Sequence, residues 1–180
     1  MADLESLRAQ LTPVQCEILN AVWDFYRQRA EWISARVLHH RFGKEAVRSA
    51  LQQLGGSIAY EAKDSGKERY GLTFLGVLLT DQGEEIEQLL AGYLSYLRDR
   101  FDADPGIELV KSQEVEAALH LSADESRLLR QLIRLGHFYG DGGSFGDQEW
   151  SVGLPYNVVY QRSRTARAIV GGLAGSAENP

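Results

Sequence analysis

The stretch from Ser34 to Thr73 constrains the fold of this chain more than any other part. Residues 44–54 predict an amphipathic helix, because the helical period separates their apolar side chains from their polar ones. The apolar side carries Ala46, Val47, Ala50, Leu51 and Leu54. The pair Gly55-Gly56 follows directly and predicts the end of this helix, since glycine is a common residue just past a helix C-terminus.

The segments on either side of this helix complete a recognisable order. A shorter helix is predicted from Ser34, as its N-cap, to Phe42-Gly43, with Val37 and Leu38 buried. Residues 57–62 and 68–73 alternate apolar and polar side chains and predict a hairpin, with 63–67 as its turn and Gly66 at a positive φ. Two helices joined by a short glycine turn are the unit that places its second helix in a DNA major groove.

The residues before this stretch predict one more helix. Residues 1–10 are expected to be a frayed lead-in, and Thr12 as N-cap with Pro13 after it predicts a helix to about residue 30. Its apolar stripe is Val14, Ile18, Leu19, Val22, Trp23 and Tyr26. Residues 31–33 are expected to form a short strand that pairs with the hairpin, and residues 73–80 a short helical piece.

The same order of elements recurs in the second half of the chain. A long helix is predicted over 84–101, a strand over 107–110, and a helix from Ser112, as N-cap, to about residue 120. Ser122 and Glu125 form a capping box that opens a helix to Leu135, with Gly136 as its C-cap. Strands are expected at 137–139 and 148–154, joined by the glycine-rich run 140–146. The predicted fold class is therefore mainly α with small β-hairpins (α+β), in modules over 1–82 and 83–155 and a partly disordered tail over 156–180.

Both modules resemble the winged helix-turn-helix superfamily. The first match covers about residues 11–73 and is carried by Val37-Leu38, Phe42-Gly43, Val47, Leu51, Leu54, and Tyr70-Gly71-Leu72-Thr73 leading into Gly76. The second covers about 84–155, and its best piece is the run from Val115 to Glu125. The resemblance implies two winged-helix modules in tandem and, as the common use of that fold, binding of duplex DNA.

The resemblance also implies which residues would touch DNA. Lys44, Arg48, Ser49 and Gln52 would enter the major groove, where Arg and Gln can make bidentate contacts to base edges. The wing residues Lys63, Lys67 and Arg69 would meet phosphates. An ordinary solvated surface is the alternative, because Glu45, Glu61, Asp64 and Glu68 lie nearby in the sequence.

A second basic face is predicted on the 123–135 helix. Arg127, Arg130 and Arg134 fall within about 60° of one another around its axis. They could contact phosphates, or they could pair with acidic residues of the same module such as Asp124, and the second interpretation is slightly favoured.

The net charge of −6 and the pI near 5.3 argue for caution about nucleic acid, because phosphate binding depends on Lys and Arg. Residues 1–80 carry ten basic and nine acidic side chains, whereas residues 81–180 carry nine basic and sixteen acidic ones. Two functions therefore stay open. The first is a DNA-binding protein, expected to be a transcriptional regulator, and the second is a winged-helix interaction module or adaptor in a larger complex without nucleic-acid binding.

Other classes of function find no motif to support them. Cys16 is the single cysteine, which favours a reducing compartment, and without a signal peptide or an apolar span we expect a cytoplasmic protein with no membrane contact. His39 and His40 lack partners at metal-ligand spacing, and the 140–146 run lacks the features of a phosphate-binding loop. We expect no catalytic residues, no metal and no cofactor. The long helix 84–101 could be internal core, or it could pair with its copy in a homodimer.

Overall fold

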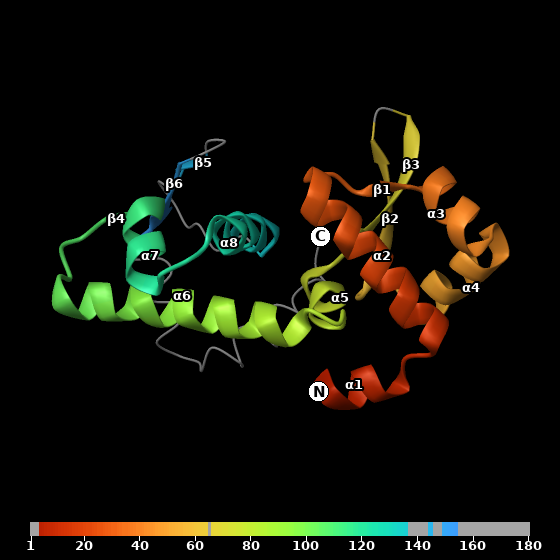
Figure 1. Ribbon diagram of the computed structural model, residues 1–180, viewed down its shortest axis with the longest axis horizontal. Coiled ribbons are helices and arrows are strands. Elements are labelled where there is room, and N and C mark those ends of the chain that lie inside the picture. The colour runs from red at the N-terminus through yellow and green to blue at the C-terminus, as the bar shows by residue number, and fades with distance from the viewer. Residues whose placement is uncertain (1–3, 65, 137–143, 146–148, 155–180) are drawn as a thin grey trace. The chain divides into compact units, whose positions relative to one another are not determined.

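The computed structural model describes residues 4–64, 66–136, 144–145 and 149–154, and the chain divides into two compact units. Unit 1 ends at Glu84, and unit 2 begins at Glu85. Each unit combines helices with one small three-stranded antiparallel sheet (Figure 1), which confirms a mainly α fold with small β-hairpins. The predicted disordered tail, 156–180, lies outside the described residues.

Unit 1 follows the predicted order of elements closely. Its elements are α1 (Leu4–Gln10), α2 (Pro13–Arg29), β1 (Ile33–Ser34), α3 (Ala35–Phe42), α4 (Lys44–Leu54), β2 (Ala59–Asp64), β3 (Lys67–Leu72) and α5 (Phe74–Leu78). Helix α2 begins where predicted, because Thr12 Oγ1 accepts a hydrogen bond from Gln15 N and the Gln15 side chain accepts one from Thr12 N. Helix α4 has the predicted bounds, and Gly55 takes a positive φ of 75° at its end.

Strand β3 is the centre of the unit 1 sheet, with strand order β1-β3-β2. Ile33 of β1 pairs with Tyr70, and β2 pairs with β3 from Ala59–Leu72 to Asp64–Lys67. The predicted turn over 63–67 is therefore too long, since both strands continue further and only two residues separate them. Gly66 takes the positive φ that this tight turn needs, at 78°.

The core of unit 1 lies between α2, α3, α4 and the sheet. Trp23, Leu38, Val47 and Leu72 are fully buried there. The prediction that Val14 and Val37 are buried is wrong, because they are 46% and 48% exposed. On α3 the buried stripe is set by Ala35 and Leu38, and Val37 lies about 100° away from Leu38 around the axis. Ala46, on the flank of the α4 stripe, is exposed as well.

Two hydrogen bonds between residues far apart in the sequence connect the ends of unit 1 to its interior. The predicted frayed lead-in is instead helix α1, which is held by Arg8: its Nη2 donates to Leu78 O at 2.6 Å, at the end of α5. Thr73 caps α5 by accepting from Gly76 N and donates its own hydroxyl to Ser57 O at 2.6 Å. A Cβ on Gly76 would lie 2.1 Å from Ile58 O, so this close approach requires glycine.

Unit 2 repeats the element order. Its elements are α6 (Gly83–Ala103), β4 (Leu109–Lys111), α7 (Ser112–Leu119), α8 (Ala123–Leu135), β5 (Ser144–Phe145) and β6 (Trp150–Gly153). The sheet order β4-β6-β5 again places the last strand at the centre. The capping box of Ser122 and Glu125 is confirmed, with Ser122 N donating to Glu125 Oε2 at 2.8 Å and Glu125 N donating to Ser122 Oγ at 3.3 Å.

Two details of unit 2 differ from expectation. Ser112 is the first residue of α7 rather than its cap, and its hydroxyl accepts a hydrogen bond from Trp150 N at 3.3 Å. The strand that pairs with β6 on the side away from β4 is Ser144–Phe145, inside the run predicted to be a loop. The strand predicted at 137–139 and the rest of the glycine-rich run lie outside the described residues.

Candidate nucleic-acid interface

The exposed face of α4 is the polar surface that the sequence singled out in unit 1. Lys44, Arg48, Ser49 and Gln52 are all exposed on it, while Val47, Ala50 and Leu54 bury the opposite face. Gly43 separates α3 from α4 with a positive φ of 85°, which sets the sharp turn between the two helices. No salt bridge among the described residues involves Lys44 or Arg48, so both cations remain available to an anionic partner.

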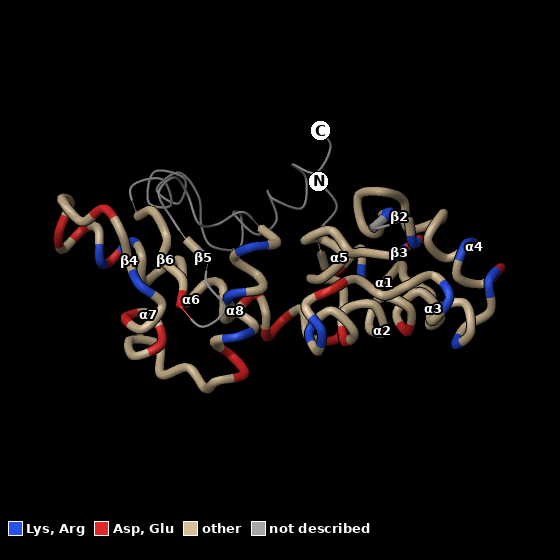
Figure 2. The backbone as a smooth tube through the Cα atoms, turned by 90° about the horizontal axis from the view of Figure 1, so that it is seen from above, with Lys and Arg blue, Asp and Glu red and all other residues tan. Residues whose placement is uncertain are grey.

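Helix α3 adds basic residues that the sequence reasoning did not assign to the interface. Arg36, His40 and Arg41 are exposed, and α3 contains no acidic residue. Arg41 lies over the ring of Phe42 at 4.9 Å. Figure 2 shows Lys and Arg recurring along α3 and α4. The i, i+4 spacing of Arg36 and His40 could have revealed this row, because such residues share one side of a helix.

The register of the hairpin divides its basic residues between two faces. Lys63 lies opposite Glu68, and Arg69 lies opposite Ala62, in neighbouring pairs of the ladder. Because successive side chains of a strand point to opposite faces, Lys63 shares a face with Tyr70, and Lys67 shares the other face with Arg69. Lys63, Lys67 and Arg69 therefore do not form one cluster.

Arg69, which the resemblance implied as a phosphate contact, makes contacts within unit 1. Its side chain is 15% exposed, its Nη1 donates to Trp32 O at 2.5 Å, and its Nη2 forms a salt bridge with Glu31 at 3.2 Å. The guanidinium ties β3 to the segment that precedes β1. A side chain held in this way serves the fold of the sheet, and the geometry does not support Arg69 as a phosphate contact.

A hollow of about 340 Å³ lies between α4 and β2. Its lining residues are Arg48, Leu51, Gln52, Ala59, Tyr60 and Glu61. Arg48 supplies N–H donors, Glu61 supplies acceptors, and Gln52 supplies both, which is the chemistry that recognises base edges. The carboxylate of Glu61 also opposes the approach of phosphates.

Tyr70 lies beneath this face and joins three elements. The residue is 3% exposed, and its hydroxyl oxygen is 2.9 Å from His39 Nε2 of α3. Burial raises the pKa of Tyr70, and the charge of Glu61 raises it further, whereas the charge of the Arg48 guanidinium lowers it. The side chain of His39 therefore links α3 to the sheet.

Tyr60, at the other side of the hollow, is fixed by packing. Its ring covers Gly71 on the neighbouring strand, where a Cβ would lie 2.6 Å from Tyr60 Cζ. Its ring and that of Trp32 lie edge to face at a centroid distance of 6.1 Å, and Trp32 stacks on Tyr26 at 4.1 Å. Burial raises the pKa of Tyr60. This aromatic row stiffens β2 where it borders α4.

The second basic face, on α8, is partly neutralised within unit 2. Arg127 forms a salt bridge with Asp124, as the alternative interpretation predicted. Arg134 is exposed, and Arg130 is partly buried. The structure does place the three arginines on one helix, but it does not make them a free cationic stripe.

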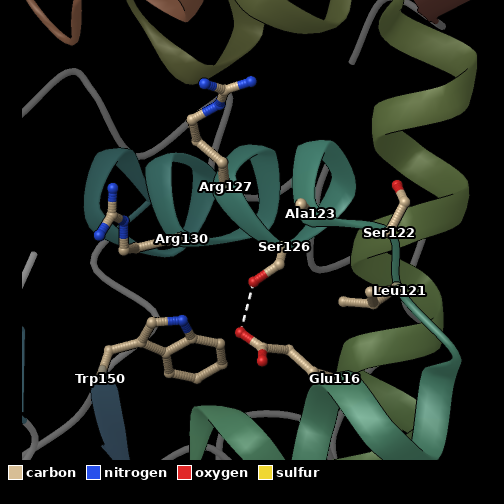
Figure 3. Close-up of a pocket in the computed structure, with 8 residues that line it drawn as sticks. All are labelled: Glu116, Leu121, Ser122, Ala123, Ser126, Arg127, Arg130 and Trp150. Carbon is tan, nitrogen blue, oxygen red and sulfur yellow. Dashed lines mark hydrogen bonds between the residues drawn. The ribbon is translucent and has the colours of Figure 1, made fainter. Parts of the chain in front are cut away.

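A hollow of about 420 Å³ borders α8 in unit 2. Arg130, Ser126, Glu116 and Trp150 line it, and Figure 3 shows Arg127 extending to the side of α8 away from Glu116. The Ser126 hydroxyl donates to Glu116 Oε1 at 2.5 Å. One oxygen of the Glu116 carboxylate therefore already accepts a hydrogen bond from the protein, so the protein itself uses part of the hydrogen-bonding capacity of this hollow.

The rest of the described chain offers no second kind of site. Within it, no group of three or more His, Cys, Asp or Glu side chains is arranged to hold a metal ion. None of the helices in the described ranges is long and apolar enough to cross a membrane. No family model, no curated protein and no solved structure matches the chain.

Proposed function

We propose that this protein binds duplex DNA, that each unit is a winged helix-turn-helix module, and that the protein acts as a cytoplasmic transcriptional regulator. In this proposal α4 of unit 1 enters the major groove, and the β2–β3 hairpin lies along the backbone. The order helix, strand, helix, helix and hairpin in both units supports the module assignment, together with the central position of the last strand in both sheets.

One observation carries the proposal: the exposed face of α4 holds Lys44, Arg48 and Gln52 without a salt bridge among the described residues. A solvated surface helix commonly carries both signs of charge in pairs, whereas a reading helix presents donors and acceptors to base edges. The exposed basic residues of α3, which has no acidic residue, extend the same positive character.

The expected strength of phosphate binding follows from the available cations. Lys44, Arg48, Lys63 and Lys67 are the assigned residues that remain unpaired by salt bridges in the described chain. If the three lysines each neutralise a phosphate, while Arg48 contacts base edges, log K falls with log salt at a slope of about −2.7, at about −0.9 per contact. Affinity would then fall about 40-fold between about 50 and 200 mM salt.

Fluorescence anisotropy with a labelled duplex of random sequence, titrated over salt, tests the proposal. We expect binding at low salt with a slope of about −2 to −4. Lys44→Ala should make the slope shallower by about one contact, while Arg98→Ala, which removes an exposed arginine from α6, should leave it unchanged. Absence of binding at low salt, or equal effects of the two substitutions, would exclude α4 as the DNA contact.

The second candidate is a winged-helix interaction module in a larger complex without nucleic-acid binding. The acidic second half of the chain favours it, with nine basic and sixteen acidic side chains over residues 81–180. The same anisotropy titration separates the two candidates, because this module would show no binding to duplex DNA even at low salt.

The homodimer through the long helix stays a prediction. One observation speaks against the apolar face of α6 as its interface. Tyr93 and Leu97 of α6 are fully buried, and the rings of Tyr93 and Trp150 lie edge to face at a centroid distance of 6.2 Å. That part of α6 is occupied within unit 2. Light scattering of the purified protein would measure its oligomeric state.

A further inference from the structure

The hollow between α4 and β2 is lined by two opposite charges that do not pair with each other. Its volume is about 340 Å³, with one wall from α4 and the other from β2. Arg48 lines it from α4 and Glu61 lines it from β2, and both residues are exposed. Within the described chain neither residue takes part in a salt bridge, so the guanidinium and the carboxylate both keep their charge for a ligand.

The helix and the strand determine where these two side chains lie. On α4, Arg48 and Gln52 are one turn apart and therefore share one side of the helix. On β2, Glu61 lies opposite Tyr70 in the ladder, so the two side chains are on the same face of the sheet. That face is the one toward α3, since the Tyr70 hydroxyl oxygen is 2.9 Å from His39 Nε2. The Glu61 carboxylate therefore leaves β2 on the helix side of the sheet.

The two charges together restrict what the hollow can hold. A simple anion would be repelled by Glu61, and a simple cation would be repelled by Arg48. A zwitterion avoids both, because its carboxylate can accept hydrogen bonds from the guanidinium while its ammonium donates to the Glu61 carboxylate. Hydrogen bonds between ionised groups are stronger than those between neutral ones. The two side chains are too far apart to form a salt bridge with each other, which leaves room for such a ligand between them.

We propose that this hollow binds a free α-amino acid with an apolar side chain. The α-carboxylate of the ligand contacts Arg48, and its α-ammonium contacts Glu61. The apolar part of the lining, which is Leu51, Ala59 and the ring of Tyr60, contacts the ligand side chain. The volume lies near the lower end of the range for small-molecule sites, about 300 to 1,000 Å³, which suits a ligand of this size. One consequence rests on the DNA-binding function proposed above: the ligand occupies Arg48 and should therefore compete with duplex DNA.

Titration of the full-length protein with L-leucine, followed by NMR of its backbone amides, tests the site directly. Two analogues each lack one charge: 4-methylpentanoic acid lacks the ammonium, and 3-methylbutylamine lacks the carboxylate. We expect saturable shifts at residues 48–52 and 59–61 with leucine. The affinity for each analogue should be about 10- to 100-fold lower, because each loses its hydrogen bonds to one ionised side chain.

Substitutions in the hollow give a readout that general destabilisation would not imitate. In Glu61→Gln, leucine and 4-methylpentanoic acid should bind with nearly equal affinity, because the ammonium has lost its charged partner. In Arg48→Gln, leucine and 3-methylbutylamine should become nearly equal for the corresponding reason. Glu17→Gln is the matched control: Glu17 is exposed on α2 and does not line the hollow, so the preference for leucine over both analogues should be unchanged.

The outcomes separate the amino-acid site from the DNA-binding function. If leucine gives no saturable shifts, or if either analogue binds as tightly as leucine, the inference is wrong whatever the duplex titration shows. If leucine binds in the hollow and the protein binds no duplex at low salt, the amino-acid site stands and the proposed function fails. If the protein binds both, excess leucine should lower its affinity for duplex, and an unchanged affinity would contradict the competition.

Discussion

Replacing Glu61 by glutamine is expected to strengthen binding to duplex DNA. Glu61 is exposed on β2 and lines the hollow that also contains Arg48 and Gln52. When α4 enters a groove, this carboxylate is carried toward the phosphates on the groove edge. Glutamine has nearly the same shape and removes only the charge, so the repulsion is the quantity that changes.

The size of the effect follows from Coulomb's law. Two like charges about 7 Å apart repel by about 0.6 to 1.2 kcal/mol for an effective dielectric constant of about 80 to 40. This corresponds to an affinity about 3- to 8-fold higher for Glu61→Gln at low salt. With a Debye length of about 8 Å at physiological ionic strength, screening reduces the gain to about twofold.

Anisotropy titrations of a random duplex at low and physiological salt measure this difference directly. Glu17→Gln is the matched control, because Glu17 is exposed on α2 and its replacement changes the net charge by the same amount. We expect the control to gain less than about twofold. Equal gains for both variants would show that only net charge matters, and no gain for Glu61→Gln would show that the hollow does not face DNA.

Three further substitutions test the structure elsewhere. Arg69→Ala is expected to lower the free energy of unfolding by about 1 to 3 kcal/mol through its lost tether, while the salt slope of DNA binding stays unchanged; a shallower slope would return Arg69 to the interface. Gly76→Ala should cost about 1 to 3 kcal/mol or more in urea unfolding, because its Cβ would meet backbone, whereas Gly92→Ala, where a Cβ meets only a side-chain atom at 3.9 Å, should be neutral or stabilising. Ser122→Ala removes the hydroxyl hydrogen bond to Glu125, the larger of the two bonds from residue 122 that lower the pKa of Glu125 below its ordinary value of 4.5, and keeps the backbone one. A carboxyl group whose pKa is lowered by folding stabilises the fold above its ordinary pKa and loses that effect as pH falls through the folded pKa. The loss of thermal stability in Ser122→Ala should therefore be larger at pH near 7 than at pH near 3. An equal loss at both pH values would contradict the direction of the pKa shift.

The elements that the sequence predicted correctly depend on neighbours in the chain. Helix α4 has an apolar stripe of helical period and glycines at both ends, and its bounds match the prediction. The start of α8 depends on Ser122 and Glu125, three residues apart. Such signals are short-range interactions, so a stretch of sequence contains all of their partners.

In the candidate site, the sequence predicted the exposed face of the helix but not the faces of the hairpin. The sequence placed Lys44, Arg48, Ser49 and Gln52 on one exposed face, because the helical period alone decides that. It assigned Lys63, Lys67 and Arg69 to the hairpin without dividing them between its faces, and the strand register puts Lys63 on the face opposite to Lys67 and Arg69. Register depends on how two strands pair, and a shift of one residue exchanges the two faces.

The tertiary structure alone decided the interactions between segments far apart in the chain. Arg8 makes α1 a docked helix by bonding Leu78 O, and Arg69 is withdrawn from the surface by Trp32 and Glu31. The contact between His39 Nε2 and the Tyr70 hydroxyl needs α3 and the sheet to meet. Local periodicity thus determined which side chains each helix exposes, while packing determined which of those side chains are free to bind, because a partner distant in sequence becomes a neighbour only when the chain has folded.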